Sequence, residues 1–515
     1  MDQAEKEGKA RLFVREATGL VKNVSLLDAV SLNLSDTSAG AALATIGFTT
    51  LLLPTMFGVN LVYASIIAFA LVIPQIVIYT MMSRRMPRTG GDYVWTSRTL
   101  GGFAGNVLAF IGYTLGNLPY AALIALSAVF AIGAVGTVMN VPALSSLFSA
   151  GTNEFIVAAV ILAILFAINV YRPRAAYKLI TVFTIIGIVT VVLAIVTLLA
   201  VGRTGVENYV ASLGNSTLSY GNISSTYVKN YTGSTFNWSN TLVFVPFFAL
   251  FSYPWINAGP AVASEIKGKS ALKWNVPVSA ILVFALVTGG FATMYYVGGF
   301  NFVNGALSNS TMVNYYSFNF WTLAMGASGN ALLSWIIGIG WILWVINILA
   351  YLIVVEARYL MAQSFDRFLP SKVTSVNKQG SPWVAHAIDF VIILVMVAGA
   401  SYLYGTFVSL YGTIIGPMIY FMFVGVAAVV YALRNEKGSA RAVLAIAGVL
   451  SAFAFLFLVY EFYTFGYQIW GASNLAYGYL VVAAVAAVVI YALSKWYHKK
   501  RGIDISLTFK EIPPE

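Results

Sequence analysis

The stretch from Asn33 to Gly40 places a carboxylate, hydroxyls and a glycine inside an otherwise apolar segment. Apolar runs lie on both sides of it, at 26–34 and 41–53. Neither run alone reaches the roughly 20 residues that cross a bilayer, and together they do so only if the polar stretch lies at membrane depth. An acidic residue there costs about 2.5 to 3.5 kcal/mol on insertion scales. Asp36 therefore marks a candidate functional site, the alternative being a surface turn between two short helices.

The chemistry that a broken helix offers is ion binding by its backbone ends. Amides that follow the break carry partial positive charge, so Thr37 to Ala41 are expected to receive a carboxylate. Three roles are open to Asp36: it pairs with an ammonium group on the substrate, it titrates and carries a coupling proton, or it caps a half-helix. The candidate site residues in this stretch are Ser35, Asp36, Thr37, Ser38, Ala39 and Gly40.

A second interruption lies at Ser252–Pro260, where Pro254 and Pro260 flank a glycine. Each proline removes a backbone donor and clashes with the preceding turn, so an ideal helix cannot continue through this segment. An ordinary kink is the alternative, since proline kinks are common in membrane helices. Two breaks in corresponding positions favour a binding site at the membrane midplane. The carbonyl ends before this break would accept bonds from an ammonium group, and its candidate residues are Phe251, Ser252, Tyr253, Trp255 and Asn257.

The composition predicts an all-α polytopic membrane protein. Of the 515 residues, 59% are hydrophobic and 9% are charged, and the mean hydropathy is +0.83. The sequence has no cysteine and only two histidines, His386 and His498, so it offers no thiolate metal site, cysteine nucleophile or paired-histidine motif. No catalytic residue, metal site, cofactor or nucleic-acid partner is expected, and an integral-membrane enzyme is disfavoured.

Apolar runs predict twelve transmembrane spans. All Lys and Arg except Arg203 and Lys229 fall in tails and loops on one side of these spans, which places both termini in the cytoplasm of a multi-pass cell-membrane protein. The opposite side carries the N-glycosylation pattern N-x-S/T, which also occurs by chance in polar loops. The spans lie near 26–53, 60–82, 103–132, 154–171, 177–201, 241–264, 276–299, 332–357, 384–403, 406–432, 442–463 and 475–496, and the outer patterns begin at Asn215, Asn222, Asn230, Asn237 and Asn309.

Three loop motifs resemble the amino acid-polyamine-organocation (APC) transporters. The segment from Pro87 to Tyr93 resembles the P-x-x-G-G-x-Y motif that follows the second helix of that family. Glu265-Ile266-Lys267 is similar to its E-x-K segment at the end of the sixth helix. The run from Arg358 to Pro370 resembles its R-x-x-x-A-x-x-x-D-x-x-L-P loop. The motifs stand in the family's order, and the resemblance covers roughly residues 25 to 500.

The resemblance implies the LeuT-type fold, in which helices 1–5 and 6–10 form two inverted repeats, helices 1 and 6 are discontinuous and two helices are peripheral. It implies a secondary active transporter that moves amino acids or amines by alternating access, by symport with a proton or sodium ion, or by exchange. A substrate-sensing receptor or a channel on the same fold is the alternative. The expected parts are a tail (1–25), the first repeat (26–201), an outer loop (202–240), the second repeat (241–432), peripheral helices (433–497) and a tail (498–515).

The same resemblance directs the substrate side chain toward spans three, eight and ten. The expected lining there is Tyr113, Asn117, Trp344, Asn347 and Tyr411, with Tyr253 or Trp255 closing over the substrate as a gate. Most aromatic residues of such a chain are structural, which is the alternative for each of them. Glu356 lies near a span end, where pairing with Arg358 or snorkelling of the side chain toward the membrane surface is expected. Membrane lipid is an expected partner, and the sequence leaves the oligomeric state open.

Overall fold

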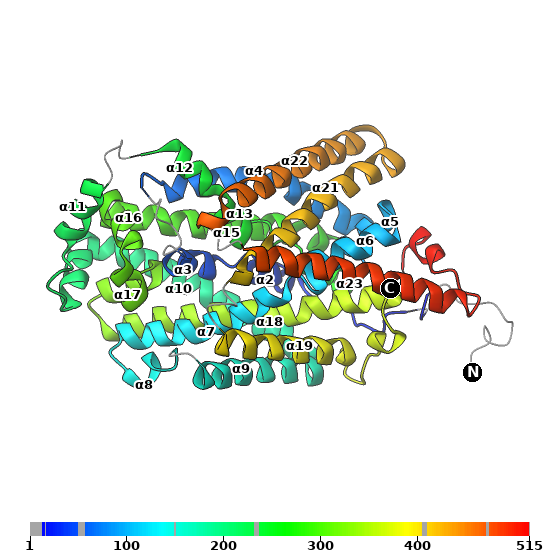
Figure 1. Ribbon diagram of the computed structural model, residues 1–515, viewed down its shortest axis with the longest axis horizontal. Helices are drawn as coiled ribbons and strands as arrows, with labels where there is room; N and C mark the ends of the chain where they lie inside the picture. The colour runs from blue at the N-terminus through cyan, green and yellow to red at the C-terminus, as the bar shows by residue number, and fades with distance from the viewer. Residues whose placement is uncertain are drawn as a thin grey trace.

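The structure is a computed structural model that describes residues 13–15, 17–49, 57–148, 151–230, 236–403, 409–469 and 473–513. Over these residues it is a bundle of helices that run along the long axis of the molecule, without strands beyond two isolated bridges (Figure 1). Ten of the described helices are long and apolar enough to cross a membrane. The prediction of an all-helical, polytopic membrane protein is confirmed.

The ten continuous spans coincide with ten of the predicted ones, and the long helices are tilted against one another in Figure 1. The third predicted span, 103–132, passes through a π-helical turn between its two α-helical parts. The spans are α4 (Leu61–Arg85), α6 (Gly102–Ala109) with η2 (Phe110–Thr114) and α7 (Leu118–Val138), α9 (Thr152–Tyr171), α10 (Pro173–Ser212), α15 (Lys269–Gly298), α18 (Ala331–Phe365), α19 (Trp383–Tyr402), η6 (Ser409–Ile414) with α21 (Ile415–Asn435), α22 (Gly438–Ile469) and α23 (Asn474–Lys499).

The first predicted span is interrupted at a single residue. α2 (Leu26–Thr37) begins at a capping box in which Ser25 and Asp28 exchange hydrogen bonds, and it ends at Ser38, whose φ is 42°. α3 (Ala39–Thr49) follows at once. The break is shorter than the polar stretch suggested, because the Ser35 and Thr37 hydroxyls donate to carbonyl oxygens one turn back and the polar residues remain helical.

The other predicted span, 241–264, is interrupted over several residues. α12 (Trp238–Val243) and α13 (Val245–Phe251) lead to Ser252, where the helix stops, and α14 (Ala258–Ala261) with η3 (Ala263–Glu265) resumes after Asn257. Pro260 stands in the first turn of α14, a place where its missing N–H costs no helical bond. The structure therefore contains both predicted discontinuities, while the count of twelve spans and the inverted repeats remain predictions.

The predicted outer loop, 202–240, is partly helical. α10 continues through Gly202, whose φ of 58° bends the helix, to Ser212. The remaining short helices cap one end of the bundle or connect spans at the other. They are α5 (Asp92–Thr99), α8 (Pro142–Ser145), α11 (Tyr220–Asn230), α16 (Phe300–Ser308), η4 (Thr311–Tyr315), α17 (Phe320–Ala327), η5 (Ser371–Thr374) and η7 (Ile505–Lys510).

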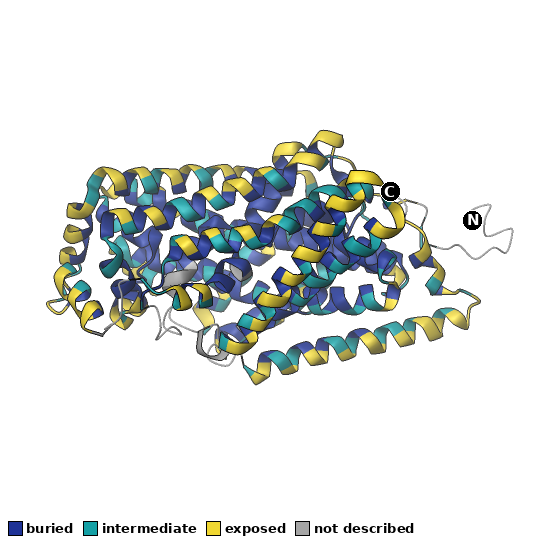
Figure 2. Cartoon of the chain, turned by 90° about the horizontal axis from the view of Figure 1, so that it is seen from above, coloured by how far each residue is buried: buried dark blue, intermediate teal, exposed yellow. Residues whose placement is uncertain are grey.

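The interrupted helices occupy the middle of the bundle. α2 packs against α10, α15 and α18, and its residues from Asp28 to Thr37 are buried. Buried residues run through the centre of the bundle and exposed ones lie along its outside (Figure 2). Many of the exposed outer side chains are large and apolar, as a lipid-facing surface requires.

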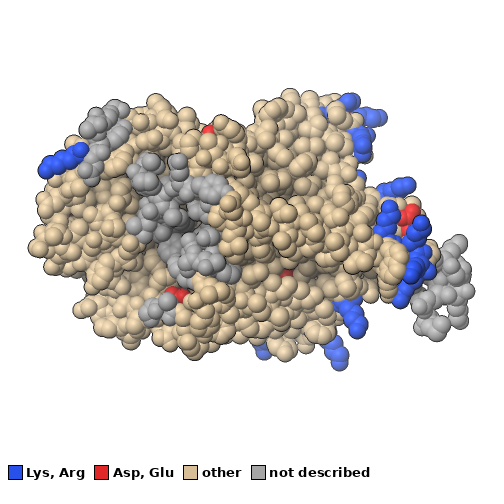
Figure 3. All heavy atoms as spheres, in the orientation of Figure 1, with Lys and Arg blue, Asp and Glu red and all other residues tan. Residues whose placement is uncertain are grey.

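Charge is concentrated at one end of the molecule. Figure 3 shows most of the visible Lys and Arg side chains at the end where α5 and the last turns of α23 lie. We call this end the basic end. The opposite end carries α8, α11, α16 and α17 (Figure 1), and the space between the two ends shows almost no basic side chain in this view.

Candidate functional site

Asp36 and Asn33 lie nearly one turn apart on α2, and both bind backbone amides at the start of α14. Asp36 Oδ2 accepts the N–H of Ala258 at 3.0 Å, and Asn33 Oδ1 accepts the N–H of Gly259 at 2.7 Å. The first N–H groups of a helix have no partner within that helix, so these side chains satisfy them. The predicted capping role of Asp36 is thus present in altered form, because the capped helix belongs to the other interrupted span.

The connection between the two interrupted spans runs in both directions. Ser252 Oγ, at the end of α13, donates to the carbonyl oxygen of Thr37 at 2.8 Å. Tyr351 of α18 hydrogen bonds to the Asp36 carboxyl group. Each broken helix therefore satisfies a backbone end of the other, and the breaks face one another inside the bundle, as the sequence predicts.

Ser35 and Asn347 meet in a polar cluster on the other side of α2. Asn347 Nδ2 donates to Ser35 Oγ at 2.6 Å and lies 2.9 Å from Thr184 Oγ1. The Asn347 Oδ1 atom has no hydrogen-bond partner among the described residues. This cluster fixes the interrupted helix against α10 and α18, and it brings together two of the predicted site residues.

Ser38 forms the turn between α2 and α3, and Ala39 and Gly40 are the first two residues of α3. Ser38 Oγ accepts the N–H of Ala41 at 3.2 Å, and the Gly40 carbonyl accepts the indole N–H of Trp321 at 2.9 Å. No hydrogen-bond acceptor is recorded within the described ranges for the amides of Ala39 and Gly40. These amides are the donors that this break leaves for a ligand.

Gly40 packs directly against the indole of Trp344. A Cβ built on Gly40 would lie 2.4 Å from Trp344 Cγ, and one built on Gly187 of α10 would lie 2.1 Å from Trp344 Cε3. The indole therefore fills the space between two glycines, one on each neighbouring helix. Trp344 is thus a packing residue at this break, and its predicted role in lining the substrate side chain stays a prediction.

The substitution Gly40→Ala is expected to destabilise the protein by about 1 to 3 kcal/mol, because the added methyl group overlaps the Trp344 ring. Thermal unfolding in detergent measures this effect. Gly478→Ala on α23 is the matched control, since a Cβ there meets no atom within 4 Å and alanine favours a helix. Equal unfolding temperatures for the two variants would contradict the packing described for Gly40.

Trp255 and Asn257 of the second interruption lie together with Tyr113 of the third predicted span. The rings of Tyr113 and Tyr359 stack with centroids 4.4 Å apart, and Trp255 meets Tyr113 edge to face at 6.2 Å. Asn257 Nδ2 donates to the Tyr359 hydroxyl at 3.1 Å. The Tyr113 hydroxyl is buried and has no partner among the described residues. The structure thus brings three predicted site residues into one aromatic layer.

Tyr253 and Phe251 are placed differently from the other candidates. The Tyr253 hydroxyl is 2.5 Å from Ser65 Oγ, and Ser65 in turn contacts Thr288, so this side chain points toward α4 and α15. It packs against Phe248 and Phe69 rather than against Trp255. Phe251 closes α13 with its backbone, and its side chain, like that of Tyr411, lies outside the described residues. Of the two predicted gate aromatics, only Trp255 adjoins Tyr113.

Asn117 binds the carboxyl group of Glu356, which the sequence analysis expected to pair with Arg358. Its Nδ2 donates to Glu356 Oε1 at 3.0 Å, and Glu356 is only 2% exposed. The expected pairing of Glu356 with Arg358 is wrong. Arg358 instead pairs with Glu265, with Nε and Oε1 2.9 Å apart. Residues two apart on a helix point in different directions, which explains the separate partners.

Buried polar groups close the bundle on the basic side of the site. Asp92 accepts hydrogen bonds from the hydroxyls of Tyr79, Tyr359 and Tyr420 at 2.5, 2.5 and 2.9 Å. These tyrosines come from α4, α18 and α21. Tyr177 adds a hydrogen bond to Glu265, at 2.9 Å. The helices α4, α5, α10, α18 and α21 and the short helix η3 are therefore joined on the basic side of the site, and the loop motifs supply Asp92, Glu265 and Tyr359.

The glycine pair of the first loop motif explains why the loop approaches the second interrupted span so closely. The N–H of Gly90 donates to the carbonyl of Ala261 at 2.9 Å. A Cβ on Gly91 would lie 2.7 Å from the carbonyl oxygen of Pro260, and Gly90 has a φ of 84°. Only glycine tolerates both the close approach and the positive φ. The motif is thus a backbone contact onto the end of α14.

Several residues of the site were not predicted from the sequence. Asn33 lies in the polar stretch, and Asp92 and Tyr359 lie inside the loop motifs, so local signals for these three exist. Thr184 and Tyr351 carry no such signal, because each is an ordinary residue of a long apolar helix, and Trp321 carries none either, because it lies on the short helix α17 outside every predicted span. Their roles depend on contacts with α2 and α3 that the sequence does not state.

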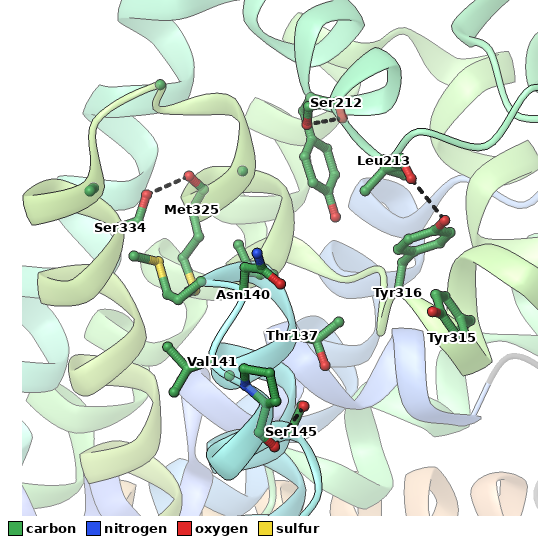
Figure 4. A pocket seen from close by; sticks show the side chains of 18 of the residues that line it. Thr137, Asn140, Val141, Ser145, Ser212, Leu213, Tyr315, Tyr316, Met325 and Ser334 are labelled. Carbon is green, nitrogen blue, oxygen red and sulfur yellow. Dashed lines mark hydrogen bonds between the residues drawn. The ribbon is translucent and has the colours of Figure 1, made fainter.

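A cavity of about 820 Å³ opens at the end opposite the basic end. Figure 4 shows Thr137, Asn140, Tyr316 and Ser334 around it, and Tyr316 donates to the Leu213 carbonyl at 3.1 Å. None of the predicted site residues lines this cavity. Its walls are the end of α7, α8, the end of α10, and the segments around α17 and the start of α18.

Comparison with known proteins agrees with the loop motifs. The family model described as "Amino acid permease" matches residues 25–493, nearly the whole chain. No curated protein matches the sequence. The matched range begins at the cap of α2 and ends within α23, so it contains both interruptions, nine of the continuous spans and most of the tenth. The chain belongs to the amino acid permease family of APC transporters, a family of membrane proteins that move amino acids.

Proposed function

We propose that the protein is a secondary active transporter that carries amino acids or related amines across the cell membrane by alternating access. The observation that carries this proposal is the meeting of the two interrupted spans, whose broken ends face each other at Asp36 and Ala258. Paired helix breaks at membrane depth bind charged solutes with backbone groups. Symport with a proton or sodium ion, or exchange, supplies the driving force.

The substrate would be gripped by its own backbone. Its carboxylate would bind the amides of Ala39 and Gly40, and its ammonium group would bind carbonyl oxygens at the end of α13, near Ser252. The substrate side chain would then face the aromatic layer formed by Tyr113 and Trp255. Such a site distinguishes substrates by the size and polarity of their side chains.

The two ends of the molecule support an alternating-access cycle. Between the site and the basic end, the tyrosines around Asp92 and the Glu265–Arg358 ion pair close the bundle. At the opposite end a cavity of about 820 Å³ opens between helices. In such a cycle, this arrangement would correspond to the half in which the basic end is closed. Release of substrate on the basic side would require these buried bonds to separate.

The proposed orientation places the basic end and both termini in the cytoplasm. Basic residues of membrane proteins concentrate on the cytoplasmic side, and most visible ones gather at this end (Figure 3). The N-x-S/T pattern at Asn222 lies on α11 and that at Asn237 caps α12, both at the opposite end. Residues 26–201 and 241–432 would form the inverted repeats, with α22 and α23 peripheral.

A ligand screen tests the proposed function. Purified protein is heated with each of the twenty L-amino acids and with simple amines, at two pH values, with and without sodium. A ligand that binds the folded state at 100 times its Kd stabilises that state by about 2.7 kcal/mol, so a raised unfolding temperature is expected for a subset of amino acids. The ligands that respond are then assayed for uptake into vesicles that contain the protein.

The uptake assay separates the alternatives. Uptake that is accelerated by unlabelled substrate inside the vesicle supports a carrier. Binding without flux would instead indicate a receptor, and flux that only dissipates a gradient, without exchange, would indicate a channel. Vesicles without protein and the D-amino acids serve as controls. A screen in which no amino acid or amine binds or moves would contradict the proposal.

A further inference from the structure

Glu356 is a carboxyl group buried among the spans, nearer the basic end than the site. It follows Tyr351 by five residues on α18, so it lies about 7.5 Å farther along that helix. Glu356 is only 2% exposed. Its Oε1 atom accepts a hydrogen bond from Asn117 Nδ2 at 3.0 Å. Within the part of the chain that the structure describes, no Lys, Arg or His forms an ion pair with it.

The charged groups that face Glu356 are acidic. Asp36 on α2 and Asp389 on α19 both interact with it electrostatically, and Asp389 is 4% exposed with an Oδ2 atom that has no partner among the described residues. The nearest cation on its own helix, Arg358, is paired with Glu265. An ionised carboxylate is costly to bury without a cation or several donors. This environment favours the neutral acid.

Asn117 is complementary to the neutral acid. Its Nδ2 already donates to Glu356 Oε1, while its Oδ1 atom is buried and has no partner in the described ranges. A carboxylate offers acceptors only, whereas a protonated carboxyl group adds one O–H donor. One proton on Glu356 would therefore satisfy the Asn117 Oδ1 atom and complete a two-bond pair between the acid and the amide.

Asp36 has the opposite environment. It accepts the backbone N–H of Ala258 and a hydrogen bond from Tyr351. Both partners are donors, as an ionised carboxylate requires, and the N–H belongs to the start of a helix, where negative charge is favourable. Asp36 thus has a backbone donor and a hydroxyl donor, whereas the one donor to Glu356 among the described residues is the amide of Asn117, whose own Oδ1 atom still lacks a donor.

From this geometry we propose that Glu356, paired with Asn117, is the binding site of the proton that is coupled to transport. The inference rests on the proposed function and names its coupling ion. A proton from water forms the Glu356 O–H while the basic end is closed. When the hydrogen bonds to Asp92 and the Glu265–Arg358 ion pair separate, water reaches Glu356. The Glu356 O–H then gives its proton to that water, and Glu356 becomes a carboxylate. Neutralisation would thus accompany closure of the basic end.

The first test follows the acid itself and needs no substrate. Infrared difference spectra of the purified protein, recorded during a pH titration, are expected to contain a protonated-carboxyl band that is absent from Glu356→Gln. Glutamine copies the neutral acid, because its amide donates to Asn117 Oδ1 and its oxygen accepts from Asn117 Nδ2. The variant is therefore expected to unfold at or above the wild-type temperature. A band that persists in Glu356→Gln, or a marked loss of stability, would overturn the assignment.

The second test measures coupling. Uptake of the amino acid identified by the screen is expected to rise at least about fivefold under an inward proton gradient in the wild type and to lose this stimulation in Glu356→Gln. Glu207→Gln, on the exposed part of α10, is the matched control and is expected to keep the stimulation. Stimulation that survives in Glu356→Gln would overturn the proposal.

Failure of this inference is distinguishable from failure of the proposed function. A wild type that exchanges amino acids without any response to the proton gradient would leave the transporter intact and overturn the role of Glu356. A wild type that neither binds nor exchanges any amino acid would contradict the proposed function and, with it, the coupling. The infrared titration would in that case still report whether Glu356 holds a proton.

Discussion

Replacing Asp36 with alanine is expected to lower the rate of amino acid uptake by about 10- to 150-fold, the equivalent of about 1.5 to 3 kcal/mol. The substitution leaves the N–H of Ala258 and the hydroxyl of Tyr351 without their acceptor. Of the two α2 side chains that bind amides at the start of α14, Asn33, which binds Gly259, would remain. Initial uptake rates in vesicles, normalised to the amount of folded protein, measure the effect.

Asp36→Asn then separates the three roles that the sequence leaves open. Its amide oxygen still accepts the Ala258 N–H, so more transport is expected than in Asp36→Ala. A changed preference between charged and neutral substrates would assign the carboxylate to the substrate ammonium. A lost pH response would assign the coupling proton to Asp36 and overturn the proposal for Glu356. An unchanged substrate preference and pH response would leave the connection between the two spans as its role.

Replacing Glu265 with alanine is expected to destabilise the protein by about 3 to 5 kcal/mol, because it leaves the Arg358 guanidinium buried without a counter-charge. Arg358 is 1% exposed, and its Nε donates to Glu265 at 2.9 Å. Tyr177, which donates to the same carboxylate, would lose its acceptor as well. Thermal unfolding in detergent measures the loss, and limited proteolysis reports whether the basic end opens.

Two variants control for this effect. Glu265→Leu combined with Arg358→Met removes both charges together and is expected to recover most of the stability, since apolar replacement of a whole buried pair is often neutral. Glu207→Ala removes one partner of an exposed pair with Arg203 and is expected to change stability by at most about 1 kcal/mol. A double variant as unstable as Glu265→Ala would show that packing, and not the unpaired charge, dominates.

The sequence predicts the broad architecture because membrane spans are a local property. Apolar runs bounded by charge located the ten continuous spans, and Asp36 and Pro254 marked the two interruptions. The extent of the first break was harder to predict, because a polar stretch such as 33–40 is typical of a turn, whereas its residues up to Thr37 are helical. Thr37 stays helical because its hydroxyl donates to Asn33, a bond that substitutes for water inside the membrane.

The partners of the site residues could not be predicted, because they are distant in the sequence. Nothing near Asn347 indicates that it binds Ser35, and nothing near Glu356 indicates that it faces Asn117 instead of Arg358. Tyr253 satisfied every local expectation for a gate, yet its hydroxyl turns to Ser65. Side-chain direction on a helix depends on which neighbour it packs against, and that information belongs to the assembled bundle.

The bond between Asp36 and Ala258 also has a consequence for how the chain is made. The two residues are 222 positions apart, and synthesis proceeds at about 5 to 20 residues per second, so Asp36 precedes its partner by about 10 to 45 s. For that interval the first span holds an acidic residue without its amide donor. The first interrupted span must therefore stay next to the insertion machinery, or pack against α10, until the second interrupted span has been synthesised.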